Sequence, residues 1–390
     1  MAPISRRSFL STTLLSAGTA LALGRLAWSR ATEAVPLVPG KEDLIIRSLR
    51  FYDLEAPVAL LDSWITPVSQ FFVRNHMSEP TTFDADAYRL IVTGEVEHPL
   101  SLTLADLKKL ATTTVVNTLE CAGNGRALYQ PHVPGVQWQR GAVGTARYTG
   151  PRLKDVLAQA GLKPTAKHVA FKGLDEPLGK VPPFIRSIPI EKALDPDTLL
   201  AMQMNGAPLL IHHGYPVRAL VPGWIGAASC KWLTEIRVLE HEFDGNFMKP
   251  GYRIPKEPVE PGAEVKPEDT VSITGLNVKS LITQPAEGAI VKSGSLQIKG
   301  AAWAGEADVT KVEVSTDGGR SWNPAQFGAD RAKYAWRFFE YRWKPGKSGD
   351  YTLMARATDS RGRMQPAKSP WNPSGYLWNG IDEVNIHVES

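Results

Sequence analysis

Hydrophobic and polar positions alternate with two different periods in the central part of the chain, residues 40–260. The segment DADAYRLIVTGEV, residues 84–96, alternates as a half-buried strand does and ends at a glycine turn. SLTLADLKKL, residues 101–110, opens with Ser and Thr and then places leucines at helical spacing. RLKDVLAQAGL, residues 152–162, predicts a second short helix that stops at Gly161. Three further segments are predicted to be strands: 168–175, 218–223 and 232–239. The mixture predicts an α+β domain built of short elements.

Beyond residue 270 the pattern changes to short alternating strands separated by turn signals, without helices. The strand segments are 295–303, 309–327, 334–343 and 351–365. Asp-Gly-Gly at 317–319 marks a hairpin turn. This pattern predicts an immunoglobulin-like sandwich. The stretch 256–270 is dense in Pro, Glu and Lys and is predicted to be a linker, which divides the chain into domains at 32–265 and 266–390.

The first 31 residues are predicted to be an export signal. Arg6 and Arg7 precede Phe9-Leu10 and an apolar run rich in small residues, which is the twin-arginine pattern. The alternatives are a membrane anchor or a buried helix, but the run from Phe9 to Leu23 is short and rich in Ser and Thr compared with the ~20 apolar residues of a span. Export by this route predicts a periplasmic protein that leaves the cytoplasm already folded, often around a cofactor, and needs no membrane once the signal is removed.

Composition narrows the class of protein. Hydrophobic residues make up 43% of the chain and charged residues 22%, which argues against both a disordered and a polytopic membrane protein. The formal net charge is +4, and the predicted signal contains four arginines and no acidic residue, so the remainder carries 4 − 4 = 0. Nucleic-acid binding therefore has no support from charge. No Cys-x-x-Cys-His is present, so no covalent c-type haem is expected on this chain.

One of the two cysteines occupies a distinctive setting, VVNTLECAGNGRAL at residues 115–128. Cys121 follows a β-branched run and precedes a glycine turn and Arg126. A thiolate is a soft-metal ligand, glycines let a bulky cofactor approach the backbone, and an arginine holds an anion. The alternative is a buried structural cysteine, which is how we interpret Cys230. In an exported protein the two cysteines could also pair, and the sequence cannot decide that.

Two other segments add cationic and hydrogen-bonding groups. FFVRNHM, residues 71–77, carries Arg, Asn and His in succession. HHGYPVRALVPGWIGAASCKWL, residues 212–233, interleaves glycines with three groups suited to phosphate: His213, Arg218 and Lys231.

Six motifs in order make the chain resemble the sulfite oxidase family of mononuclear molybdopterin enzymes, of the bacterial periplasmic type, from about residue 65 to 380. They are FVRNH, ECAGNGR, GVQWQRGAVGTARYTGPRLKDVL, MNGAPL, HGYPVRALVPGWIGAASCKWL and WNPSGY. The resemblance implies a molybdopterin-binding domain followed by a dimerisation domain, and hence a homodimer. It also implies a single molybdenum–molybdopterin cofactor.

The same resemblance implies roles for individual residues. Cys121 matches the protein ligand of molybdenum. The cofactor-binding residues implied are Arg74, Asn75, His76, Cys121, Asp175, His213, Arg218 and Lys231. The catalytic or substrate-pocket residues implied are Tyr252, Arg74, Arg126 and Trp138. Trp138 has the alternative of a core aromatic and Tyr252 that of an ordinary loop tyrosine, while His212 is set aside as a neighbour of His213.

One position departs from the family pattern. The motif near the C-terminus usually reads Trp-Asn-Pro-Arg-Gly, and its arginine helps to bind the oxyanion, whereas Ser374 stands there in this chain. One positive charge of the expected anion site is therefore missing. Arg253, Arg331 and Lys333 are the candidates for replacing it.

The activity that the resemblance implies is molybdenum-dependent oxidation of sulfite to sulfate, with electrons passed to an external c-type cytochrome. Two alternatives use the same cofactor: a sulfane-sulfur dehydrogenase, for which a changed anion site is natural, and an oxo-transfer reductase of a sulfoxide or nitrate. A non-enzymatic binding protein of the cell envelope is the alternative from another class.

Overall fold

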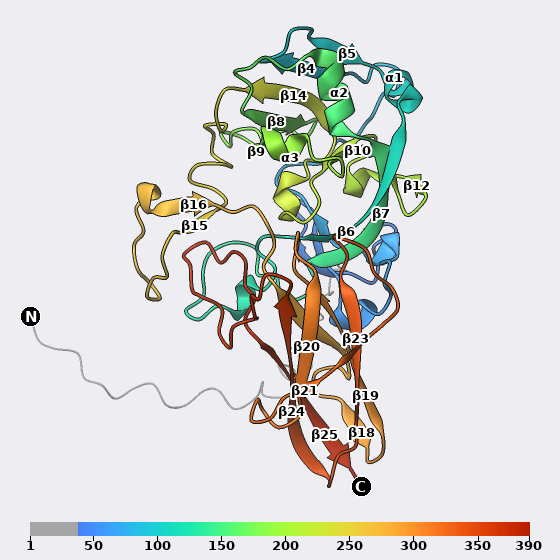
Figure 1. The fold of residues 1–390 in the computed structure, drawn as a ribbon, viewed down its shortest axis with the longest axis vertical. Helices are drawn as coiled ribbons and strands as arrows, with labels where there is room; N and C mark the ends of the chain where they lie inside the picture. Colours follow the sequence, from blue (N-terminus) through green and yellow to red (C-terminus); the bar gives the residue numbers. More distant parts are fainter. Residues whose placement is uncertain (1–37) are drawn as a thin grey trace, which may run out of the picture. The chain divides into compact units, whose positions relative to one another are not determined.

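The computed structural model describes residues 38–390, and the predicted export signal lies outside them (Figure 1). The description that follows concerns the compact unit formed by residues 43–390. Among residues 38–390 no helix has the length and apolar character that crossing a membrane requires.

Strands predominate, and the described α-helices are short. They are α1 (Leu104–Lys109), α2 (Leu153–Ala160) and α3 (Ile190–Ala193). Both predicted helices are thus confirmed, although each is shorter than its segment. At the start of α1 the Thr103 and Asp106 side chains cap each other's backbone, and α2 ends at Gly161 with φ 68°. One-turn 3₁₀ helices lie at η1 (Val58–Leu60), η2 (Val68–Gln70), η3 (Arg126–Leu128), η4 (Ile211–His213), η5 (Gly226–Ala228) and η6 (Pro267–Asp269).

A five-stranded mixed sheet forms one part of the N-terminal region. Its order is β5 (Leu100–Leu102), β4 (Leu90–Gly94), β14 (Leu233–Leu239), β8 (His168–Gly173) and β9 (Ile185–Pro189). Only β14 and β4 run parallel. The strands predicted at 84–96, 168–175 and 232–239 are therefore confirmed as β4, β8 and β14. This sheet carries Asp175 just after β8 and Lys231 just before β14.

A long antiparallel hairpin leads directly to Cys121. Strands β6 (Thr112–Glu120) and β7 (Val143–Pro151) pair along their whole length, with Glu120 opposite Val143. Two short strands extend the sheet: β11 (Gln203–Met204) and β12 (Ala207–Pro208). In Figure 1 the hairpin curves from the side of α1 toward the C-terminal strands, where the amide of Thr118 donates to the Tyr334 carbonyl, 2.8 Å away.

Two smaller sheets carry Arg218 and Arg74. The strand predicted at 218–223 is β13 (Arg218–Leu220), which pairs with β10 (Leu199–Ala201). The other sheet contains β1 (Ile45–Ser48), β2 (Asp53–Glu55) and β3 (Val73–Arg74). In its register Asp53 lies opposite Arg74.

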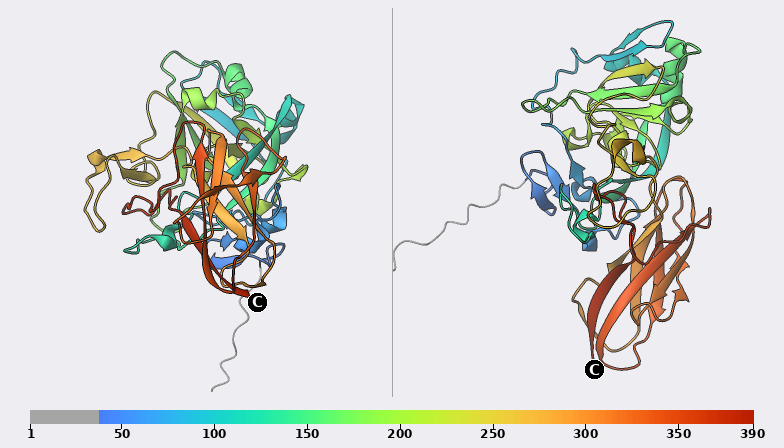
Figure 2. Two further views of the ribbon diagram at one scale, coloured as in Figure 1. Left: turned by 60° about the horizontal axis from the view of Figure 1, so that its bottom comes forward. Right: turned by 90° about the vertical axis from the view of Figure 1, so that its left-hand side faces the viewer.

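Two sheets form the C-terminal domain, in orange and red in Figures 1 and 2. One has the order β17 (Lys279–Gln284), β19 (Leu296–Trp303), β23 (Arg337–Trp343), β22 (Gln326–Phe327). The other has the order β18 (Ile290–Lys292), β25 (Asp382–Glu389), β24 (Gly349–Asp359), β20 (Val309–Ser315), β21 (Asn323–Pro324). Buried residues from both sheets, such as Phe339 and Leu353, share one apolar core. The strands predicted for this region are confirmed.

The stretch predicted to be a linker forms a loop between two paired strands. β15 (Arg253–Pro255) and β16 (Thr270–Ser272) are antiparallel, so the chain leaves and returns at the same place. The boundaries 32–265 and 266–390 stay predictions.

Candidate active site

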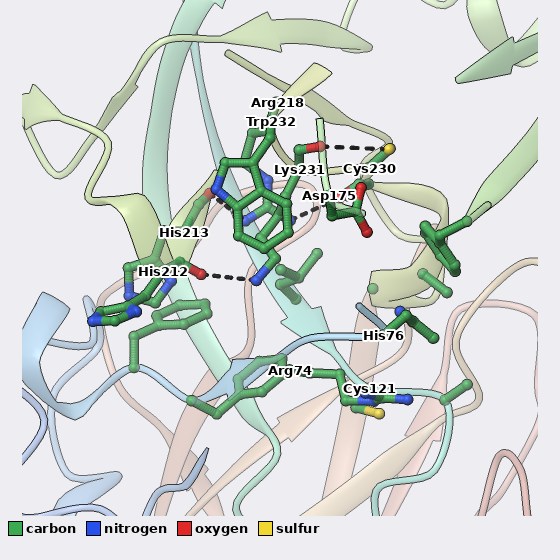
Figure 3. A pocket seen from close by; sticks show the side chains of 18 of the residues that line it. Arg74, His76, Cys121, Asp175, His212, His213, Arg218, Cys230, Lys231 and Trp232 are labelled. Carbon is green, nitrogen blue, oxygen red and sulfur yellow. Dashed lines mark hydrogen bonds between the residues drawn. The ribbon is translucent and has the colours of Figure 1, made fainter. Parts of the chain in front are cut away.

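A pocket opens beside Cys121 and measures about 670 Å³, including the solvent at its mouth. It joins segments that are far apart in the sequence. Eight of the predicted site residues line it: Arg74, His76, Cys121, Asp175, His213, Arg218, Lys231 and Tyr252. Arg74 and Cys121 lie together at one end, and Lys231, Arg218 and Asp175 lie toward the other (Figure 3).

Cys121 is fixed by the turn that follows β6. Its amide donates to the Ala142 carbonyl at 2.9 Å, and its carbonyl accepts from the Asn124 amide at 2.9 Å. Gly125 has a φ of 96°, and a Cβ there would stand 2.8 Å from the Trp378 Cβ, so this turn requires glycine. Burial raises the pKa of the Cys121 thiol, and the charge of Arg74 opposes the rise. A cation bound at this sulfur would complete the deprotonation.

Arg74 reaches the same end of the pocket from β3. Its guanidinium pairs with Asp53 at 3.1 Å and also donates to the Asn75 carbonyl. Burial lowers the pKa of Arg74, but the negative charges facing it, Asp53 first, raise that pKa by more. The guanidinium therefore stays charged beside the sulfur, where it can hold an anion.

His76 and Tyr252 form a hydrogen-bonded pair across the pocket, between the His76 Nε2 and the tyrosine hydroxyl. His76 stacks on Phe184 with ring centroids 4.0 Å apart, and Tyr252 stacks on Tyr376 at 5.1 Å. Burial, reinforced by Arg74, holds the pKa of His76 well below its usual value. Burial also raises the pKa of Tyr252. A neutral imidazole and a neutral phenol can pass one proton between them.

Lys231 lies toward the end of the pocket away from Cys121 (Figure 3). Its Nζ donates to the His212 carbonyl at 2.9 Å and to the Asn75 side-chain oxygen. Burial, with the nearby charge of Arg218, lowers the pKa of Lys231 to about 7. Burial raises the pKa of Asp175 to about 6, and Lys231 opposes that rise. An anion bound here would restore the lysine to its charged form.

Arg218 is buried beside Lys231. It donates to the carbonyls of His213 at 3.1 Å and Ser229 at 2.9 Å. Its Nε is buried with no hydrogen-bond partner among residues 38–390, and burial lowers the pKa of the guanidinium. A buried donor without a partner is costly, and an anionic ligand at this end of the pocket could satisfy it.

Three predicted site residues are not part of the pocket lining. The side-chain oxygen of Asn75 accepts a hydrogen bond from Lys231. Arg126 donates to the carbonyls of Ser374 at 3.1 Å and Val136 at 3.0 Å, and lies over the Tyr376 ring. Trp138 is fully buried in a hydrophobic cluster, which agrees with its alternative as a core aromatic. The roles predicted for these residues stay predictions.

Several lining residues were missed by the sequence analysis. His212, which the sequence does not distinguish from a mere neighbour of His213, lines the pocket, and its Nδ1 lies 2.9 Å from Glu79 Oε2. The adjacent histidine was the only signal for it. Aromatic side chains also line the pocket, at Phe71, Phe72, Phe184 and Trp232. No sequence pattern distinguishes them from core residues.

None of the three cations suggested as replacements for the missing arginine lines the pocket. Arg253 binds Thr270 and lies 3.7 Å from Glu242. The other two form ion pairs of 3.0 and 2.9 Å elsewhere, Arg331 with Asp308 and Lys333 with Asp197. Each is held by its own partner outside the pocket lining, which does not support that suggestion from the sequence.

Two family comparisons cover most of the described chain. Residues 76–247 match the oxidoreductase molybdopterin binding domain, and residues 270–389 match the Mo-co oxidoreductase dimerisation domain.

Individual relatives agree with these families. The chain is 40% identical over 368 residues to the mitochondrial sulfite oxidase of Rattus norvegicus, covering 88% of this chain and 66% of that protein. It is 33% identical over 368 residues to the sulfite oxidase of Arabidopsis thaliana, covering 87% and 92%. The structure matches the sulfane dehydrogenase SoxCD of Paracoccus pantotrophus with a TM-score of 0.75 and 28% identity, over 92% of this chain and 91% of that one. The chain thus spans just under two thirds of the rat protein and nearly all of the plant protein.

Proposed function

The chain belongs to the sulfite oxidase family of molybdopterin oxidoreductases, and on that premise we propose that it oxidises sulfite to sulfate in the periplasm and passes the electrons to an external c-type cytochrome. One observation carries the proposal. A single pocket places the Cys121 sulfur beside Arg74 at one end and two buried cations, Arg218 and Lys231, at the other.

The residues present fit a molybdenum–molybdopterin cofactor. The Cys121 thiol is the soft donor that such a metal takes. Arg218, with its buried and unpartnered Nε, and Lys231 line the same pocket, which suits an anion such as a pterin phosphate. His213, Arg218 and Lys231 would hold that phosphate, and Asp175 would accept hydrogen bonds from the pterin ring system.

When bound, the cofactor supplies the two-electron oxidation and the oxygen transfer. Arg74 would hold the sulfite anion near the Cys121 sulfur and offset the negative charge of the sulfite. Tyr252 would hydrogen-bond the reacting oxygen, and His76 would share the tyrosine proton through the hydrogen bond between them. Phe184 and Tyr376 stack on this pair and keep it in place.

A second candidate is oxidation of sulfane sulfur carried on a protein. The structural match to a sulfane dehydrogenase and the serine at 374 both favour it. A substrate with less charge at the reacting sulfur needs fewer cations around it.

Steady-state kinetics of the purified protein separate the candidates. Sulfite and a protein-bound persulfide are each assayed with ferricyanide, cytochrome c and oxygen as acceptors. The proposal expects turnover with sulfite and cytochrome c. Turnover with the persulfide alone would contradict sulfite as the substrate and support the second candidate. Turnover with oxygen alone would contradict a cytochrome as the electron acceptor.

We also propose that the C-terminal domain is an immunoglobulin-like dimerisation domain. Two sheets, of orders β17-β19-β23-β22 and β18-β25-β24-β20-β21, with a shared apolar core support this proposal. A two-fold dimer would join the same surface of both copies. Light scattering at micromolar concentration is expected to give twice the mass of one chain, which is 42.7 kDa with the signal. A single-chain mass under these conditions would contradict the proposal.

Restoring the family arginine with Ser374→Arg is expected to lower the Michaelis constant for sulfite about tenfold with similar turnover. A charge-assisted hydrogen bond contributes about 1.5–3 kcal/mol, which is roughly ten- to a hundredfold in affinity. Position 374 lies close to the site, because its carbonyl accepts from Arg126 and Tyr376 stacks on Tyr252. Ser374→Ala is the control, with an unchanged constant. An unchanged or higher constant in the arginine variant would mean that another cation already serves the anion or that sulfite is not the natural substrate.

A further inference from the structure

Arg186 is a buried guanidinium next to the pocket that no sequence motif indicated. It lies on β9 opposite Phe171 of β8. Phe184, just before β9, lines the pocket and stacks on His76, and Tyr252 lines the same pocket. The Arg186 guanidinium lies over the Tyr252 ring, so Arg186 lies immediately behind the pocket wall.

Arg186 forms no ion pair with an acidic residue in the described part of the chain. Its side chain is 2% exposed, and one terminal nitrogen donates to the Phe247 carbonyl. Its Nε has no hydrogen-bond partner, and within residues 38–390 no carboxylate forms an ion pair with it. Glu242 acts on it only at longer range and lies 3.7 Å from Arg253.

The guanidinium faces Tyr252. Its central carbon lies 4.6 Å from the centre of the tyrosine ring, a cation–π contact. The hydroxyl of the same ring meets His76 inside the pocket. Charges are retained in protein interiors when an opposite charge or a functional need offsets the desolvation. Because no carboxylate of residues 38–390 forms an ion pair with Arg186, a bound anion is a counter-charge that this guanidinium can still accept.

We propose that Arg186 sets the anion specificity of this pocket, supplying from behind Tyr252 the positive charge that Ser374 does not provide. Arg186 is a positioning residue, because it acts through the tyrosine ring and through its field in a water-excluded site. The nature of the anion, a sulfur oxyanion, rests on the proposed function. The alternative source of the counter-charge is the anionic cofactor.

Three variants of the cofactor-loaded protein test this: Arg186→Met, Arg186→Lys and the matched control Arg253→Met. Arg253 adjoins Tyr252 in the chain but is held by Glu242 and Thr270. Calorimetry measures the dissociation constant of sulfate, and molybdenum analysis measures cofactor content. We expect Arg186→Met to weaken sulfate binding about tenfold, and to raise the Michaelis constant for sulfite more than it lowers turnover. Arg186→Lys should restore most of the affinity, and Arg253→Met should leave it unchanged.

Stability separates this role from a structural one. Replacing a buried charge that lacks an ion-pair partner with an apolar side chain of similar length should leave the melting temperature unchanged or higher. Unchanged sulfate affinity in Arg186→Met would overturn the inference. So would reduced molybdenum content with normal affinity per loaded site, because the charge would then serve the cofactor. Absence of sulfate binding to the wild-type protein would overturn it as well.

The proposed function fails separately. A wild-type protein that binds sulfate but does not oxidise sulfite would contradict the proposed function alone. Loss of sulfate affinity in Arg186→Met would still support the inference.

Discussion

Cys121→Ser is expected to remove bound molybdenum and sulfite oxidation while the fold and melting temperature stay nearly unchanged. Serine offers a harder and more basic oxygen in place of a soft thiolate. Changes to residues around metal ligands already cost about 10–100-fold in metal affinity or activity, and this change alters the predicted ligand itself. Metal analysis, sulfite kinetics and thermal unfolding of the same preparation measure the three quantities.

Cys230→Ser is the matched control, because both cysteines line the same pocket. The Cys230 sulfur is buried and lies 3.6 Å from the Lys231 carbonyl, and burial raises the pKa of its thiol. This variant should keep its metal and lose some stability, since a hydroxyl replaces an apolar sulfur. Full activity of Cys121→Ser, or equal metal loss in both variants, would contradict the assignment of Cys121.

The sequence predicted those parts of the site whose residues lie close together along the chain. Cys121 could be found because a strand, a glycine turn and an arginine follow one another within a few residues. Arg218 and Lys231 could be found because their segment interleaves cations with glycines. Strands with clear alternation were found for the same reason, as β8 and β14 show. A pattern within one short segment thus predicts the structure and the candidate residues of that segment.

Contacts between distant segments could not be predicted in this way. Arg186 becomes significant only because it lies over Tyr252, 66 positions later in the chain (252 − 186). The stacking of Tyr252 on Tyr376 likewise depends on tertiary packing. Arg253, which the sequence analysis suggested for the anion site, is held by the pairing of β15 with β16. These contacts depend on which surfaces pack together in the folded protein, and the spacing of residues along the chain does not indicate this packing.

The strand that ends at Cys121 is also held by the C-terminal domain. The carboxylate of Glu120 accepts from Lys279 Nζ at 2.9 Å, from Trp303 Nε1 at 2.8 Å and from the Asn124 side chain at 2.9 Å. Lys279 also donates to the Asn124 carbonyl at 3.2 Å. All of these side chains are buried. Lys279 of β17 and Trp303 of β19, both in the C-terminal domain, thus fix the turn that carries Cys121.

Lys279→Met is therefore expected to destabilise the protein by about 3–5 kcal/mol, because it leaves the Glu120 carboxylate buried without its cation. With an entropy of unfolding of about 2.1 cal/mol/K per residue over ~350 residues, that is a fall of roughly 4–7 °C in melting temperature. Molybdenum content should fall as well, since the turn after Glu120 loses its support. Thermal unfolding and metal analysis measure the two effects.

Two further variants sharpen the result. Lys192→Met removes the other lysine that is buried between the domains, whose partner Glu306 lies 2.7 Å away with 36% of its side chain exposed. Water can reach that carboxylate, so the expected loss is smaller, about 1–2 kcal/mol, and metal content should be normal. Adding Glu120→Gln to Lys279→Met should recover part of the stability, because no uncompensated charge then remains. Equal losses in Lys192→Met and Lys279→Met, with molybdenum retained in both, would show that the second domain only stabilises the chain and does not support the Cys121 turn.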